Sequence, residues 1–235
     1  MQEFLQGTKA VLLYIIPAAA IMLSARKLLK IPNELFRKIL HFILLGIYIP
    51  FLIAFETWWI SALLAIILLV VIYPVLMVAE KIPAFSAFVN ERKQGEFKNS
   101  LILAFGMIAI SISVCWGWMG DKYLVLASVY AWGVGDAFAA LIGKRFGKHK
   151  IKWKLADSHK SMEGSTAMFL TSALSVYLVL SVRGGLNPAS CFIISVITAI
   201  VCTLVELCTK NGFDTVSCPT AAMIVIIPLI HFLGG

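Results

Sequence analysis

The chain has 235 residues, of which 60% are hydrophobic and 14% are charged, and its mean hydropathy is +0.93. Soluble domains contain about 45–50% apolar residues, so this composition excludes an ordinary soluble domain. The formal net charge is +8, but the basic residues stand between apolar runs, with no aromatic-interleaved basic patch apart from them. The charge therefore indicates membrane sidedness, and we expect a lipid bilayer and no nucleic acid as partner.

Eight apolar segments follow one another along the chain. They are residues 10–25, 39–55, 57–79, 100–119, 123–142, 162–182, 189–208 and 216–233. A helix needs about 20 residues to cross about 30 Å of hydrocarbon, and runs this continuous favour helices over barrel strands, which alternate with period two. The sequence predicts an all-α, polytopic membrane bundle of about eight helices in a single domain, residues 1–235.

The basic residues predict which ends of these helices face the cytosol. If the N-terminus lies outside, all but three of the 20 Lys and Arg residues fall in four inside loops, at residues 24–38, 80–99, 143–161 and 209–217. The exceptions are Lys9, Lys122 and Arg183. The positive-inside rule therefore favours an outside N-terminus, and we expect the active face to be cytosolic.

Near the end of the first inside loop, the sequence indicates a helix start with Asn33 as N-cap. Glu34, Lys38 and His41 then follow at i, i+4 and i+7 on one helix face, with Arg37 beside them. Arg37 and Lys38 are equally compatible with simple positive-inside flanks. The five cysteines show no CxxC spacing, and most lie in apolar segments, so we interpret them as small buried hydrophobic residues.

Asp136 lies inside the fifth apolar segment, six residues before Ile142 at its predicted end. A charged group within a membrane segment is costly, so by default it indicates function. Small residues surround it at helical spacing and would let a neighbouring helix or a ligand approach the backbone. These are Gly133, Gly135, Ala139, Ala140 and Gly143.

The loop after Asp136 supplies cations and a predicted anion site. Lys144, Arg145 and Lys148 follow the aspartate closely. Ser161 is a good N-cap for a helix that begins at Met162, and free N–H groups at a helix N-terminus suit an anion. Lys160, Glu163, Gly164 and Ser165 flank this helix start.

Four carboxylates are predicted at the inside ends of the later segments. They belong to Asp136, Glu163, Glu206 and Asp214. Mg²⁺ is bound by carboxylate oxygens together with the phosphates of a substrate. Any two of the four, with a nucleotide, would make such a site, and the sequence does not say which two.

Three stretches together resemble the CTP-dependent lipid-alcohol kinases, a family that includes dolichol, phytol and yeast-type diacylglycerol kinases and is related to the CDP-diacylglycerol synthases. The central stretch is GDAFAALIGKRFGKHKI followed by KSMEGSTAMF. The flanking stretches are ELFRKILHF, with Glu34, Arg37, Lys38 and His41, and ELCTKNGFDTVSCP, with Glu206, Asp214 and Pro219. The chain departs from the family pattern at Thr215, where we expect Asn.

The resemblance implies that Mg²⁺ and CTP bind at the cytosolic face and that the hydroxyl of a membrane lipid alcohol attacks the γ-phosphate. It implies metal ligation by Asp136 with Glu206 or Asp214, and a general base among Glu163, His41 and Asp214. The catalytic candidates are Asp136, Glu163, His41 and Lys160. The nucleotide or phosphate candidates are Arg37, Lys38, Lys144, Arg145, Lys148, Lys160, Ser161, Gly164 and Ser165.

Three alternatives remain open at this stage. A cytidylyltransferase acting on a lipid phosphate would use the same nucleotide and metal but release pyrophosphate. An ion-coupled transporter would use Asp136 in an ion path, although the sequence has no internal repeat to support paired halves. A structural membrane protein would leave the four carboxylates unexplained. The sequence does not determine the alcohol, and it is compatible with a homo-oligomer.

Overall fold

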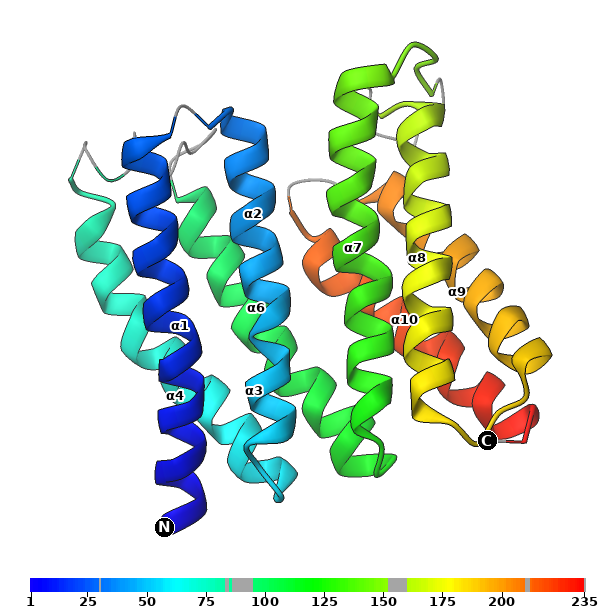
Figure 1. Ribbon diagram of the computed structural model, residues 1–235, viewed down its shortest axis with the longest axis horizontal. Helices are drawn as coiled ribbons and strands as arrows, with labels where there is room; N and C mark the ends of the chain where they lie inside the picture. Colours follow the sequence, from blue (N-terminus) through cyan, green and yellow to red (C-terminus); the bar gives the residue numbers. More distant parts are fainter. Residues whose placement is uncertain (30, 83–84, 86–94, 152–159, 210–211, 235) are drawn as a thin grey trace. The chain divides into compact units, whose positions relative to one another are not determined.

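The computed structural model describes residues 1–29, 31–82, 85, 95–151, 160–209 and 212–234 (Figure 1). Its helices are α1 (Gln2–Leu28), α2 (Asn33–Gly46), α3 (Tyr48–Ile53), α4 (Trp58–Ala79), α6 (Glu96–Ser111), the π-helix η1 (Ile112–Trp118), α7 (Lys122–Phe146), α8 (Met162–Arg183), α9 (Pro188–Cys208) and α10 (Asp214–Phe232). In these ranges there is no β-strand, only an isolated bridge between Lys150 and Ser161. The chain is all-α, as the sequence predicts.

Eight helical spans in the described residues are long and apolar enough to cross a membrane, which confirms the predicted polytopic architecture. The sixth span, Met162–Arg183, matches the predicted 162–182 closely, whereas the first begins at Gln2 and not at residue 10. Several helices continue beyond the apolar boundary, so the inside loops are shorter than predicted. α7 includes Lys144 and Arg145 in its last turn, where cations stabilise the negative end of the helix dipole.

The two predicted N-caps differ in outcome. The Ser161 Oγ accepts a hydrogen bond from the Gly164 N–H at 3.2 Å and caps α8, as predicted. The prediction for Asn33 is wrong by one residue, because Pro32 is the N-cap of α2 and Asn33 is its first helical residue. The Asn33 Oδ1 instead accepts a hydrogen bond from the Arg26 guanidinium at 2.7 Å, so its side chain is used between two helices.

The chain divides into two compact units, Met1–Gly117 and Trp118–Gly235. The expectation of one membrane domain over residues 1–235 stays a prediction. The first unit has large aromatic side chains at its centre, with Phe36, Phe51 and Phe55 almost fully buried. Its N-terminal helix is tied to the start of α4 by Glu3, whose carboxylate accepts hydrogen bonds from the backbone N–H groups of Glu56 and Thr57.

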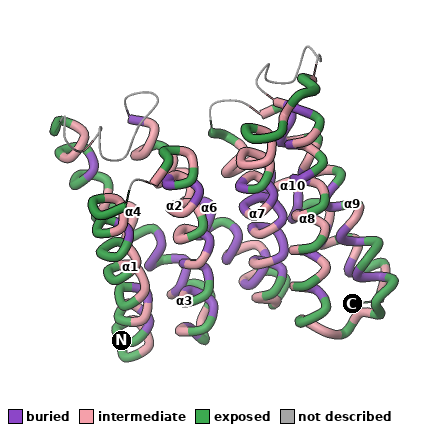
Figure 2. The backbone as a smooth tube through the Cα atoms, turned by 45° about the horizontal axis from the view of Figure 1, so that its top comes forward, coloured by how far each residue is buried: buried purple, intermediate pink, exposed green. Residues whose placement is uncertain are grey.

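The second unit consists of α7 to α10. Helix α7 packs on α8 and α10, and α9 packs between α8 and α10. Buried residues run along most of α7, whereas α8 keeps an exposed face (Figure 2). That face includes Leu170, Leu174 and Leu178, a stripe at four-residue spacing that suits contact with lipid.

All five cysteines are free, and four of them are buried. Cys202 on α9 and Cys218 on α10 exchange weak S–H hydrogen bonds with each other's backbone carbonyl oxygens. The interpretation of these residues as small buried hydrophobic groups is therefore confirmed for four of the five. Cys208 is the exception, since it is exposed at the end of α9.

Candidate functional site

One end of the second unit gathers most of the predicted site residues. The C-terminal ends of α7 and α9 and the N-terminal ends of α8 and α10 lie there because the four helices alternate in direction (Figure 1). We call this end, with Asp136, Lys160, Glu206 and Asp214, the site end. At the opposite end, Asp121 caps α7 and its carboxylate pairs with Arg183 at 2.5 Å. This pair links the start of α7 to the end of α8, at the end of the unit opposite the site end.

Lys160 and Glu206 form the best-defined charged contact of the site end. The Lys160 Nζ lies 2.7 Å from the Glu206 Oε1 and also donates to the Glu206 backbone carbonyl oxygen. The side chains are only 20% and 11% exposed. Because burying a lone carboxylate is costly, the lysine offsets much of the cost of placing Glu206 inside the helix bundle. This pair joins the chain just before α8 to the end of α9.

Two further carboxylates belong to the same end of the unit. Asp136 lies within the last three turns of α7, and Asp214 is the first residue of α10. The Asp214 Oδ2 accepts a hydrogen bond from the indole N–H of Trp132 at 3.1 Å. Trp132 precedes Asp136 by four residues, so both lie on the same face of α7. The structure therefore places Asp136, Glu206 and Asp214, which belong to three helices, at the same end of the unit. Lys160 pairs there with Glu206.

Glycines let α7 and α8 approach each other at the site end. A Cβ added at Gly164 would lie 2.9 Å from the Ala139 carbonyl oxygen and 3.3 Å from the Gly143 Cα. No side chain fits at Gly164 without movement of the α7 backbone. Gly164 therefore serves helix packing in this structure, and its predicted role in phosphate binding stays a prediction.

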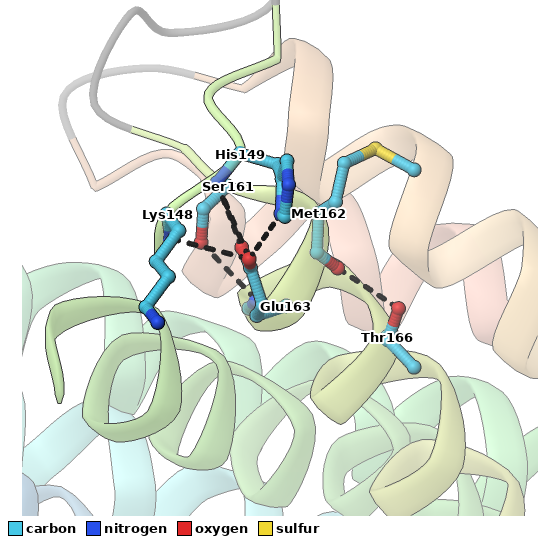
Figure 3. Close-up of polar contacts among 7 residues, drawn as sticks. Lys148, His149, Ser161, Met162, Glu163 and Thr166 are labelled. Atoms are coloured by element: carbon cyan, nitrogen blue, oxygen red, sulfur yellow. Dashed lines mark hydrogen bonds and ion pairs between the residues drawn. The ribbon is translucent and has the colours of Figure 1, made fainter. Parts of the chain in front are cut away.

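Glu163 lies in the first turn of α8, and its carboxylate faces the start of the loop that joins α7 to α8 (Figure 3). It accepts hydrogen bonds from the backbone N–H groups of Lys148 and His149, each at 3.2 Å. Its Oε1 also lies 2.7 Å from the His149 Nδ1. The carboxylate of Glu163, a predicted candidate for the general base, is therefore hydrogen-bonded to the loop backbone and to one imidazole.

The predicted cations differ in their surroundings. Lys144, Arg145 and Lys148 are exposed to solvent. The Arg145 Cζ lies 5.2 Å from the centroid of the Phe146 ring, within the limit of about 6 Å for a cation–π contact. Lys160 is instead largely buried against Glu206. Ser161 is buried, and Ser165 lies in the first turn of α8 with its N–H bonded to the Ser161 carbonyl oxygen.

The remaining candidates belong to the first unit. Arg37 lies 3.7 Å from Glu34 in its own helix and 3.4 Å from Glu96 of α6. Lys38 is buried, and the ring of His41 packs edge-on against Phe42 at 6.4 Å. The contacts that the structure shows for Arg37 are with carboxylates of the same unit. The predicted phosphate and base roles of Arg37, Lys38 and His41 stay predictions.

The side chains of the site end offer carboxylate oxygens, the kind of ligand that Mg²⁺ takes from proteins. Within the described part of the chain, no group of three or more His, Cys, Asp or Glu side chains is arranged as a ready-made metal site. Glu206 is paired with Lys160, and Asp214 accepts from Trp132. Mg²⁺ usually keeps only one or two protein carboxylates and takes further oxygens from phosphates and water. The carboxylates of the site end are therefore compatible with a Mg²⁺ ion that is also coordinated by phosphate oxygens. They do not fit a site in which protein side chains supply all the ligands.

Two residues that were not predicted as candidates, Trp132 and His149, lie at the site end. Trp132 is the donor to Asp214, and its position four residues before Asp136 is the one signal that could have indicated it. His149 pairs with Glu163 across 14 residues of sequence, and no spacing rule predicts that contact.

Comparison with known proteins gives one partial match. The chain is 45% identical over 56 residues to the dolichol kinase sec59 of Schizosaccharomyces pombe (strain 972 / ATCC 24843). The matched residues are 24% of this chain and 10% of that protein, so the similarity covers a small part of the kinase's length. No protein-family model matches the chain, and no solved structure matches it. The match indicates a partial similarity to a dolichol kinase.

Proposed function

We propose that this chain is a kinase that transfers the γ-phosphate of CTP to the hydroxyl of a membrane lipid alcohol of the polyprenol, dolichol or phytol type. The observation that supports it most is that Asp136, Glu206 and Asp214 belong to the same end of one helical unit. At that end Lys160 pairs with Glu206, and Asp214 accepts a hydrogen bond from α7. The partial similarity to a dolichol kinase supports the same reaction class. The site end would face the cytosol.

In this proposal the alcohol oxygen forms a bond to the γ-phosphorus, the bond from that phosphorus to the bridging oxygen breaks, and CDP leaves. Such a transfer depends mainly on positioning and on neutralising phosphate charge. When bound, Mg²⁺ would neutralise charge on the phosphate oxygens. Asp136 and Asp214 are the ligands that we propose for it, because Glu206 is already paired with Lys160.

The cations and the apolar surface would have separate roles. Lys144, Arg145 and Lys148 would bind phosphate oxygens from the solvent side, where the structure leaves them exposed. The alcohol would reach the site from the lipid, since its long chain is soluble there and its hydroxyl need only extend to the membrane boundary. The hydroxyl proton would pass to a carboxylate of the site end.

The test is a panel of lipid alcohols, each incubated with CTP or ATP labelled in the γ-phosphate, using the purified chain in detergent. We expect a labelled lipid phosphate and CDP, with CTP preferred. Release of pyrophosphate with a CDP-lipid from a lipid phosphate would instead identify a cytidylyltransferase. No transfer to any alcohol from either nucleotide would contradict the proposal.

A further inference from the structure

The loop between α7 and α8 is held at its base by a short antiparallel pairing. The Met162 N–H donates to the His149 carbonyl oxygen at 2.9 Å, and the Ile151 N–H donates to the Lys160 carbonyl oxygen at 3.1 Å. Lys150 and Ser161 form the bridge between them. The pairing therefore fixes the backbone of Lys160, and the Lys160 side chain extends to Glu206.

Glu163, in the first turn of α8, binds the loop residues next to this pairing. Its carboxylate lies against the backbone of Lys148 and His149, and the His149 ring turns toward it (Figure 3). The Oε2 also lies 3.4 Å from the His149 N–H. The Glu163 side chain is 25% exposed, whereas His149 is 78% exposed, so the glutamate is the inner partner of the contact.

These contacts leave the carboxylate little capacity for an additional proton. A carboxylate offers about four lone-pair directions, and here both oxygens face donors of the loop. A general base must instead come within about 2.6–3.2 Å of the proton that it removes. The hydrogen bonds of Glu163 fix the loop backbone. This role requires a hydrogen-bond acceptor at position 163, but it does not require a group that gains and loses a proton.

We infer that Glu163 is a positioning residue. It holds Lys148 and His149 against the first turn of α8, and so keeps Lys148 and Lys160 at the site end. The inference rests on the proposed function only in assigning Lys148 to phosphate binding. It assigns no proton transfer to Glu163.

Two substitutions separate this role from general base catalysis. Glu163→Gln keeps an oxygen that accepts from the loop N–H groups, and its amide N–H can donate to His149. We expect kcat to stay within about 3-fold of the wild type, whereas loss of a general base costs about 10²–10⁴-fold. Glu163→Ala removes the acceptor, and we expect the KM for CTP to rise about 10-fold with a smaller change in kcat.

Thr166→Val is a matched control on the same helix. The Thr166 Oγ1 donates to the Met162 carbonyl oxygen at 2.9 Å, so this hydrogen bond lies within α8 (Figure 3). We expect this variant to keep its kcat and KM within about 2-fold, since only one intrahelical hydrogen bond is lost. A larger loss would mean that any disturbance of this helix turn lowers activity, and would overturn the inference.

Hydrogen–deuterium exchange of a peptide covering residues 144–151 tests the contact without any enzymatic reaction. We expect the amides of Lys148 and His149 to be protected in the wild type and in Glu163→Gln, and to exchange at least about 10-fold faster in Glu163→Ala. Equal protection in all three proteins would overturn the inference, as would a loss of kcat of about 100-fold or more in Glu163→Gln. If the wild type phosphorylates no lipid alcohol, the proposed function fails while the exchange rates still decide the role of Glu163.

Discussion

The lysine–glutamate pair at the site end gives the first prediction. Lys160 and Glu206 are both largely buried and lie 2.7 Å apart. Lys160→Met would leave the Glu206 carboxylate buried without its cation, so we expect a loss of about 2–3 kcal/mol in stability and a lower melting temperature in detergent. Lys9→Met is the control, since Lys9 is exposed on α1, and should leave the melting temperature unchanged.

A double variant shows whether the charge is the cause. In Lys160→Met with Glu206→Leu, no unpaired buried charge remains, and apolar replacement of an ion pair is often neutral for stability. We expect the melting temperature to return toward that of the wild type while kinase activity stays low. A double variant as unstable as Lys160→Met would show that packing, and not the unpaired carboxylate, determines the loss.

The indole of Trp132 gives the second prediction. Its N–H donates to Asp214 at 3.1 Å, and the side chain is 7% exposed. Trp132→Phe keeps an aromatic ring but removes the donor, so we expect Asp214 to be less well oriented and the Mg²⁺ concentration for half-maximal activity to rise about 5- to 10-fold. Trp118→Phe is the control, since Trp118 is 82% exposed; equal effects of both substitutions would contradict this role.

Single residues differ in how far the sequence could predict them. Asp136 stands out because a carboxylate inside an apolar run is rare and costly. The contact between Trp132 and Asp214 spans 82 residues and depends on how α7 packs against α10, which no local pattern contains. The same holds for Lys160 and Glu206, which are 46 residues apart. The sequence could therefore predict which residues are candidates but not which ones pair.

At the scale of helices, the close contact of α7 with α8 gives the third prediction. Gly164→Ala would place a Cβ 2.9 Å from the Ala139 carbonyl oxygen. The helices would have to separate, and we expect a loss of about 1–3 kcal/mol in stability, measured as a lower melting temperature, with reduced activity because Lys160 shifts from Glu206. An unchanged melting temperature and activity would contradict this packing.

Gly106→Ala is the matched control for that substitution. Gly106 lies within α6, and a Cβ added there would have no heavy atom within 4 Å. Alanine has a higher helix propensity than glycine, so we expect a neutral or slightly stabilising effect. A comparable loss at both positions would mean that glycine itself, and not the close contact, matters for these helices.

Helices were more predictable than their exact ends. The apolar runs predicted all eight spans because a bilayer requires about 20 apolar residues per helix. The Ser161 cap was predictable because serine followed by Met162 and Glu163 is a local signal. The Asn33 cap was not, since a tertiary hydrogen bond from Arg26 competes for its side chain.

For the whole molecule, Cys208 offers a test of orientation. Among the five cysteines, Cys208 alone is exposed, and it is the last residue of α9, two residues after Glu206. With the predicted outside N-terminus, a membrane-impermeant maleimide should label the chain in inside-out vesicles and not in intact cells. Cys208→Ser should abolish the labelling. Labelling of Cys208 in intact cells would contradict the proposed cytosolic site.

The most direct test of the central claim follows the γ-phosphate of CTP in the purified protein. We expect label to pass from CTP to a lipid alcohol in the presence of Mg²⁺, with CDP formed in equal amount. We expect Asp136→Asn to lower this transfer by at least about 100-fold, because it removes a proposed ligand of the metal. Transfer at the full rate in Asp136→Asn, or no transfer from CTP to any lipid alcohol by the wild type, would contradict the account.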